Sequence, residues 1–317
     1  MNTIVQTAVA VHSVQLDTPT GTLAGTLTGP TDSEADHVVL IIAGSGPTDR
    51  DGNSAGLPGK NNNLKMLAEG LAQAGIASLR TDKRGVGESK AAAPPENEVH
   101  FEAFVDDAMA WLKQLQSNEQ FQHFSIIGHS EGSLIGMLAA QRSSVDAFVS
   151  LEGAGRTAQA TIMTQLGAQL PPPLLNEVQQ IVDQLAAGQL VDSLPASVTA
   201  VPALTNMFRA SIQPYLISWF RYDPAMALAD LMIPILIVQG TADLQVNVED
   251  ANRLAFANPQ AQLLVLEGMN HVLKDAPMDQ AGNLATYSQP DLPLAEGLVT
   301  AVTQFLNTAE HITAKGE

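Results

Sequence analysis

Several residue classes are scarce in this chain of 317 residues or missing from it. It has no cysteine, which excludes disulfides, a cysteine nucleophile and thiolate metal sites. Lysine and arginine number 15 against 33 aspartates and glutamates, so the formal net charge is −18. Such a surface repels phosphate backbones, and we expect no nucleic acid partner. The longest apolar runs, 38–43 and 235–238, are far too short to span a bilayer, so no membrane partner is expected either.

The first twenty residues carry no basic cluster and mix polar with apolar side chains. We therefore expect no secretory signal at this end. Together with the missing cysteines, this pattern predicts a cytoplasmic protein. Apolar residues make up 45% of the chain, which is enough for a large buried core, and a homo-oligomer is compatible with this composition.

Short β-branched runs alternate with helical patterns from residue 37 onward. Continuous apolar runs of this kind are typical of parallel strands that helices cover on both faces. Helical periodicity at 63–74 and 101–116 supplies two of those helices. Two earlier segments, 9–16 and 22–27, flank a Pro/Gly turn and indicate an antiparallel hairpin. The sequence thus predicts an α/β protein with a mostly parallel eight-stranded sheet, whose six later strands lie at 38–43, 76–79, 124–127, 147–151, 235–239 and 262–266.

One long stretch interrupts this alternation. Between the run that ends at 151 and the run that begins at 235, we find helical patterns and no strand signal. We interpret 155–222 as a helical cap inserted between the sixth and seventh strands, with 1–154 and 223–317 forming the core domain. We expect the cap to lie over the carboxyl edge of the sheet, where ligands bind in open α/β folds.

The segment 124–140, FSIIGHSEGSLIGMLAA, combines a strand, a glycine-flanked turn and a helix. Its centre fits the GxSxG pattern, in which a sharp turn lifts a serine hydroxyl out of the sheet. We therefore predict that Ser130 is a nucleophile. The N–H of Glu131 then lies at a helix N-terminus, where unpaired donors and the helix dipole favour an oxyanion. The carboxylate of Glu131 is interpreted as an acidic group that favours the start of the helix, and not as an acid–base group.

In enzymes with such a turn, an acid and then a histidine follow the serine along the chain. Asp243 comes directly after the seventh predicted strand, and His271 comes after the eighth. His311 is the other histidine that follows both Ser130 and Asp243, but it lies in the polar tail. Glu152, after the sixth strand, is the alternative acid. His129 is interpreted as a packing residue of the turn and not as a base.

The glycine-rich GSG segment after the third strand is the expected source of a second oxyanion donor. Its position assigns this donor to the N–H of Ser45, and a shift by one residue would assign it to Gly46. Three charged residues of the same segment, Asp49, Arg50 and Asp51, are interpreted as a salt-bridge cluster with Asp82 or Arg84. A role in binding a substrate carboxylate is the alternative for Arg50.

Together these motifs resemble the α/β-hydrolase superfamily across nearly the whole chain. Within it the chain resembles a bacterial esterase subfamily similar to the thermophilic esterase D, through GSGPTDRDGN (44–53), LRTDKRGVGES (79–89), IIGHSEGS (126–133), RYDPA (221–225), QGTAD (239–243) and GMNHVLK (268–274). The resemblance implies hydrolysis of short-chain acyl esters, without a cofactor, beneath a helical cap. It carries the catalytic triad over as Ser130, Asp243 and His271. The GSGP segment departs from the HGGG pattern of hormone-sensitive-lipase-like esterases, so their specificity is not carried over.

The predicted function is that of a serine carboxylesterase whose partner is a small-molecule ester. An amidase or peptidase, a thioesterase, a perhydrolase or an acyltransferase would use the same three residues, and a non-catalytic binding protein on this fold is a further alternative. Trp219, Phe220 and Tyr222 either line an acyl pocket or form the core of the cap. No metal-ligand spacing such as HExxH occurs, so no metal is expected, and the resemblance implies that no cofactor is needed.

Overall fold

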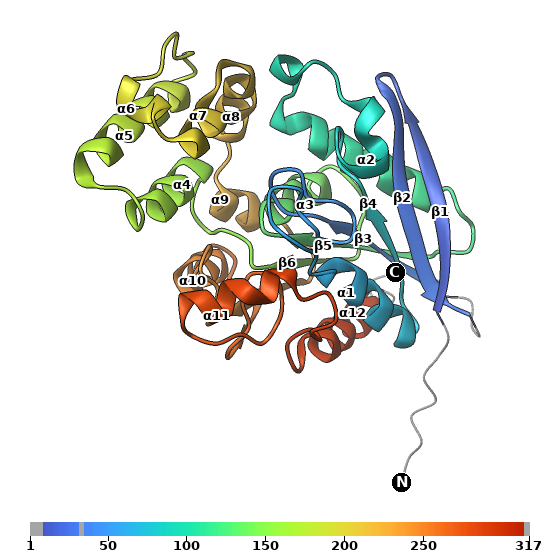
Figure 1. Cartoon of the computed structure of the whole chain (residues 1–317). Helices are drawn as coiled ribbons and strands as arrows, with labels where there is room; N and C mark the ends of the chain where they lie inside the picture. The colour runs from blue at the N-terminus through green and yellow to red at the C-terminus, as the bar shows by residue number, and fades with distance from the viewer. Residues whose placement is uncertain (1–8, 32–34, 314–317) are drawn as a thin grey trace.

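The computed structural model describes residues 9–31 and 35–313 (Figure 1). Its strands form one eight-stranded sheet. In chain order the strands are β1 (Val9–Thr18), β2 (Gly21–Pro30), β3 (His37–Ile42), β4 (Ala77–Thr81), β5 (His123–His129), β6 (Ala147–Leu151), β7 (Ile235–Gly240) and β8 (Gln262–Leu266). Their order across the sheet is β1-β2-β4-β3-β5-β6-β7-β8.

The sheet is parallel except at one edge. β1 and β2 form an antiparallel hairpin whose register runs from Val9 opposite Pro30 to Thr18 opposite Gly21. β2 also pairs antiparallel with β4, whereas the neighbours from β4 to β8 all pair in parallel. Parallel pairing brings the carboxyl ends of these strands to a common edge. The predicted eight-stranded, mostly parallel α/β-hydrolase sheet is confirmed.

Helices cover both faces of this sheet. They are α1 (Asn63–Gln73), α2 (Phe101–Gln116), α3 (Glu131–Ala140), α9 (Pro224–Ala229), α10 (Val248–Ala257) and α12 (Leu298–Thr313). On β3, Leu40 and Ile42 pack into an apolar cluster with α2, α3, α9 and α10, whereas Val39 and Ile41 pack with α1 and α12 on the other face (Figure 1). Because side chains alternate across the pleat and helices cover both faces, the segment 38–42 of β3 is apolar and buried without interruption.

A group of helices lies between β6 and β7, at the position predicted for the cap. They are α4 (Ala158–Gly167), α5 (Pro172–Ala186), α6 (Ala196–Thr199), α7 (Pro202–Phe208) and α8 (Gln213–Trp219). Figure 1 shows them side by side, away from the β1–β2 hairpin. They share an apolar cluster of their own, to which α5 contributes Val178, Ile181, Val182 and Leu185. These are the apolar residues that recur at helical spacing in the sequence.

The helix α8 joins this group to the core, through α2. The Phe101 N–H donates to the Ser218 hydroxyl at 2.8 Å, and the rings of Phe101 and Trp219 stack with their centroids 6.0 Å apart. The remaining helical segments are α11 (Gln280–Ala285) and four short 3₁₀ turns at Gly87–Ala92, Glu96–Glu98, Ala210–Ile212 and Thr286–Ser288. Over the described ranges, none of the helices combines the length and the apolar character needed to cross a membrane.

Candidate active site

Ser130 lies in the sharp turn between β5 and α3. Its backbone has φ 55° and ψ −122°, a conformation that a residue with a side chain adopts only where its surroundings impose it. The flanking glycines allow the strand and the helix to approach closely. A Cβ on Gly128 would lie 2.3 Å from the Gly132 carbonyl oxygen, and a Cβ on Gly132 would lie 2.3 Å from the Ile42 carbonyl oxygen. The turn therefore requires both glycines of the GxSxG pattern.

His271 joins Ser130 to Asp243. Its Nε2 lies 3.1 Å from the Ser130 Oγ, and its Nδ1 lies 2.6 Å from a carboxylate oxygen of Asp243. Because a carboxylate only accepts, Nδ1 donates to Asp243 and Nε2 can accept the Ser130 hydroxyl proton. Burial opposes the ionisation of Asp243, but the charge and hydrogen bond of His271 outweigh it and hold the pKa of Asp243 below its ordinary value. The structure thus brings together the three residues predicted as a triad.

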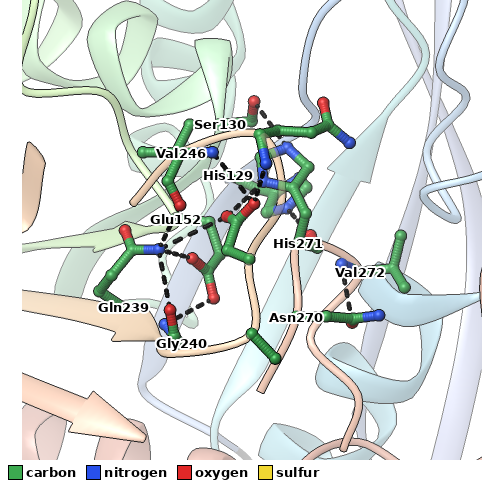
Figure 2. A network of polar contacts seen from close by, with 12 residues as sticks. His129, Ser130, Glu152, Gln239, Gly240, Val246, Asn270, His271 and Val272 are labelled. Carbon is green, nitrogen blue, oxygen red and sulfur yellow. Dashed lines mark hydrogen bonds and ion pairs between the residues drawn. The ribbon is translucent and has the colours of Figure 1, made fainter. Parts of the chain in front are cut away.

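Glu152, the alternative acid, bonds to other groups (Figure 2). One of its oxygens accepts from the Gly240 N–H at 2.9 Å, and the other accepts from the side-chain amide of Gln239. Burial raises the pKa of Glu152 well above its ordinary value, and the negative charge of Asp243 raises it further. Glu152 therefore retains its proton more readily than Asp243, and it is Asp243 that accepts the hydrogen bond of the His271 ring.

Two polar side chains hold the loop that carries His271 (Figure 2). The buried His129 donates from Nε2 to the His271 carbonyl oxygen at 2.7 Å. Burial lowers the pKa of His129 to about 3, and the His271 ring adds to this effect, so His129 is neutral near pH 7. Asn270 accepts from the N–H groups of Val272 and Lys274, both at 3.2 Å. These contacts fit the interpretation of His129 as a packing residue.

The predicted oxyanion donors lie beside the nucleophile. Ser45, the alternative Gly46 and Glu131 line the same cavity as Ser130. Glu131 is the first residue of α3, so its N–H has no partner within the helix. Within the described residues, no acceptor is found for the N–H of Ser45. The arrangement can therefore present N–H groups to an oxygen that gains negative charge near Ser130.

Two residues of this site were missed in the sequence, Lys83 and Tyr215. The Lys83 ammonium donates to the Gly44 carbonyl oxygen and lies 3.5 Å from a Glu131 carboxylate oxygen. The Tyr215 hydroxyl, from α8, donates to the other Glu131 oxygen. Lys83 belongs to the LRTDKRGVGES segment, but a lysine between an aspartate and an arginine has the appearance of a solvated charge in sequence alone.

Comparison with known sequences identifies the family of the chain. Residues 55–275 match the family described as serine aminopeptidase, S33. The chain belongs to this family. It is also similar to Esterase EstD of Thermotoga maritima, with 26% identity over 255 residues that make up 79% of this chain. The resemblance to the esterase D subfamily is thereby confirmed, although the match spans only 58% of the length of EstD.

Solved structures show the same fold for this S33 family member. Est1E from Butyrivibrio proteoclasticus, with bound ferulic acid, aligns over 95% of this chain and 98% of its own, with a TM-score of 0.58 and 17% identity. The α/β-hydrolase GrgF from Penicillium sp. sh18 aligns over 95% of this chain and 99% of its own, with a TM-score of 0.61 and 18% identity. At this identity the likeness shows the fold alone.

In this S33 family member, Ser130 lines a cavity of about 730 Å³ that lies between the core and the helices after β6. Trp219 lines it, as predicted for a pocket residue. The structure differs from the prediction for Phe220, which is absent from the cavity lining and is buried in the apolar cluster of α4–α8 with 6% of its surface exposed. Tyr222 packs against Phe101 instead, with ring centroids 5.5 Å apart.

The charged residues that line this cavity are Glu131, Arg156 and Arg209, and each has a partner of opposite charge. Arg156 lies 2.5 Å from Asp250, and Arg209 pairs with Glu96. The cavity is therefore electrically balanced and otherwise largely apolar.

Arg50, by contrast, does not line the cavity. It lies 2.6 Å from Asp82 and 2.5 Å from Glu88, which supports the interpretation as a salt-bridge cluster.

A second cavity, of about 1060 Å³, adjoins the first on the side of Asp243. Gln165, Gln245 and Val246 line both cavities. The Gln165 side-chain amide donates to the Gln245 carbonyl oxygen at 3.1 Å, and the Gln245 side-chain amide donates to the Tyr287 hydroxyl at 3.1 Å. These hydrogen bonds link polar residues at the junction of the two cavities.

Within the described residues, one group of metal-ligand side chains has its atoms close together. Glu152, Asp243 and His271 each offer an atom within 4.8 Å of the others. The Nδ1 of His271 already donates to Asp243, and Glu152 already accepts from the Gly240 N–H. The closeness of these three side chains is therefore accounted for by the hydrogen bonds that they already make.

Proposed function

We propose that this protein is a serine carboxylesterase that hydrolyses short-chain acyl esters. The observation that supports it most is the chain of hydrogen bonds from Asp243 through His271 to Ser130, at 2.6 Å and 3.1 Å, at the edge of a largely apolar cavity. The relative EstD is called an esterase, and ferulic acid, the ligand of Est1E, is a carboxylic acid of the kind that ester hydrolysis releases. These names are in accord with ester hydrolysis.

The mechanism follows from the geometry. His271 takes the Ser130 hydroxyl proton at Nε2, and the serine oxygen attacks the ester carbonyl carbon. Asp243 keeps the ring in the tautomer that accepts this proton and stabilises the imidazolium that forms. His271 then gives the proton to the leaving alcohol. A water molecule, activated by the same ring, hydrolyses the acyl-enzyme and releases the carboxylic acid.

The N–H groups of Ser45 and Glu131 would stabilise the oxyanion of both tetrahedral intermediates. One such donor is worth about 3 kcal/mol in the transition state, or roughly a hundredfold in rate. The N-terminal end of α3 adds a favourable dipole at the same place, because Glu131 begins this helix.

The shape and charge of the cavity support a neutral substrate with a short acyl chain. Its charged lining residues are paired, so it offers no counter-ion to a charged acyl group. We further propose that 155–222 act as a cap on the core formed by 1–154 and 223–317, and that activity falls beyond roughly six to eight acyl carbons.

The test is a series of p-nitrophenyl esters from two to twelve carbons, measured beside a p-nitroanilide of the preferred acyl group. We expect ester hydrolysis with a short-chain optimum, and no hydrolysis in a folded Ser130→Ala variant. A fluorophosphonate should label the wild type and not this variant. An optimum at twelve carbons would refute the short-chain proposal. Faster hydrolysis of the anilide would assign the amidase or peptidase alternative instead, because the same triad serves both reactions.

A further inference from the structure

Lys83 stands out among the buried charges of this protein because it contacts both chain segments that flank Ser130, the one at Gly44 and the one at Glu131. It follows β4, and only 9% of its side chain is exposed. Its ammonium group donates to the Gly44 carbonyl oxygen, lies 3.5 Å from the Glu131 carboxylate and lies 5.8 Å from the centre of the Phe104 ring. The triad mechanism assigns it no role.

The contact with Gly44 fixes the orientation of one oxyanion donor. In a trans peptide the carbonyl oxygen and the next N–H point in opposite directions. By holding the Gly44 oxygen, Lys83 therefore directs the Ser45 N–H away from itself. This peptide is next to the nucleophile, since a Cβ on Gly44 would lie 3.1 Å from the Ser130 Cβ.

The contact with Glu131 restrains the residue that carries the other donor. The Glu131 carboxylate lies between the Lys83 ammonium and the Tyr215 hydroxyl, and 3% of its side chain is exposed. The N–H of the same residue begins α3 directly after Ser130. One buried ammonium thus connects the two chain segments from which the two predicted donors come.

Resting on the esterase function proposed above, we propose that Lys83 is a positioning residue of the oxyanion hole, which holds the Gly44–Ser45 peptide and Glu131 in the orientation that presents both N–H groups to the substrate. Stability alone is a weak reason for such a group. A buried ion pair contributes little net stability compared with apolar side chains of similar volume, because both charges lose their hydration.

The test compares Lys83→Met with the double variant Lys83→Met/Glu131→Gln. The single variant leaves a buried carboxylate without its cation, whereas the double variant removes both charges. If Lys83 positions the Gly44–Ser45 peptide, both variants should lose about 30- to 100-fold in kcat for a short-chain p-nitrophenyl ester, with KM changed less than about threefold. The expected loss in kcat is smaller than the roughly 100- to 1000-fold loss that follows deletion of an oxyanion donor, because in these variants the N–H is displaced and not removed.

A second readout separates positioning from general damage. A trifluoromethyl ketone forms a tetrahedral adduct with the serine, and its oxyanion occupies the hole. Its inhibition constant should rise by about the same factor as kcat falls. Lys83→Arg should retain most of the wild-type kcat, because an arginine can donate to both the Gly44 carbonyl oxygen and the Glu131 carboxylate. The matched control is Arg84→Met/Asp107→Asn, which removes a neighbouring ion pair whose side chains are both 11% exposed; it should retain kcat within about threefold.

Recovery of wild-type kcat in the double variant would overturn the proposal, since Lys83 would then only neutralise Glu131. An equal loss of kcat in the control would overturn it as well. If the single variant does not fold, the double variant decides alone. Failure of the esterase proposal is distinguishable, because the wild type would then hydrolyse none of the esters before any variant is compared.

Discussion

Trp219 and Phe220 are neighbours in sequence but are placed in different surroundings, and replacing each by alanine should separate substrate selection from stability. Trp219 lines the cavity that holds Ser130 and stacks on Phe101. Phe220 is 6% exposed and packs with α4–α8. Trp219→Ala should therefore enlarge this cavity, whereas Phe220→Ala should leave a void inside the apolar cluster of α4–α8.

The size of both effects, the shift in chain-length preference and the loss of stability, can be estimated from the apolar surface that each side chain buries. If the space of the indole ring admits two further methylene groups, each contributes about 0.8 kcal/mol of burial. The ratio of kcat/KM for the eight-carbon over the four-carbon ester should then rise about tenfold in Trp219→Ala. Phe220→Ala should lower the free energy of unfolding by about 3–5 kcal/mol, the usual cost of removing a buried phenyl ring, with little change in this ratio.

The assay measures kcat/KM across the ester series for the wild type and both variants, with melting temperatures recorded alongside. For a protein of this size the loss in Phe220→Ala corresponds to a fall in Tm of roughly 4–8 °C. The reasoning fails if Phe220→Ala shifts the chain-length optimum and Trp219→Ala does not. It fails as well if Trp219→Ala shows only the loss of Tm expected for a core residue.

The remaining predictions concern the acid and the buried histidine. Asp243→Asn should lower kcat about 10⁴-fold because the His271 ring would take the wrong tautomer, whereas Glu152→Gln should change kcat less than about tenfold; the reverse pattern in steady-state kinetics would transfer the acid role to Glu152. The pKa of His129 falls from 6.5 to about 3 on folding, so between these values the unfolded chain binds a proton that the folded protein does not. Stability must then fall as the pH is lowered through this range, by up to about 1.4 kcal/mol per unit from this group. Urea unfolding at pH 7 and pH 5 should show a stability difference about 2 kcal/mol larger in the wild type than in His129→Gln, and equal differences would contradict this assignment.

The fold and the triad were predictable because they depend on local patterns. The first four residues of β7, 235–238, are all apolar, since both faces of that strand are buried. Ser130 was identified from the strand, turn and helix around it, and Asp243 and His271 from their places after β7 and β8. Each of these signals lies within about ten residues of the chain, so no knowledge of distant contacts is needed.

The lining of the cavity was not predictable in the same way. On α8, Tyr215 and Trp219 contact Phe101 of α2 and also pack against the apolar cluster of α4–α8, while Leu216 and Phe220 are buried members of that cluster. Both pairs have the spacing of four residues that places side chains on one helix face. The sequence thus shows two apolar faces and cannot say which of them meets the core. The contacts of Lys83 with Gly44 and Glu131 join residues far apart in the chain, for which no local pattern exists.

Basic residues are concentrated where the loop after β3 meets the segment around β4. The chain has only 15 lysines and arginines, yet five of them lie in β4 or in the loops after β3 and β4: Arg50, Lys60, Arg80, Lys83 and Arg84. Arg50 pairs with Asp82 and Arg80 pairs with Asp51, so the loop that carries Ser45 is tied twice to the segment around β4. Neither pair is a strong source of net stability, because the buried charges of Arg50 and Asp82 lose their hydration and Asp51 is 36% exposed to solvent. We propose that the two pairs serve to hold this loop in one conformation. A preorganised N–H donor avoids reorganisation during the reaction, which is the property that makes an oxyanion hole effective.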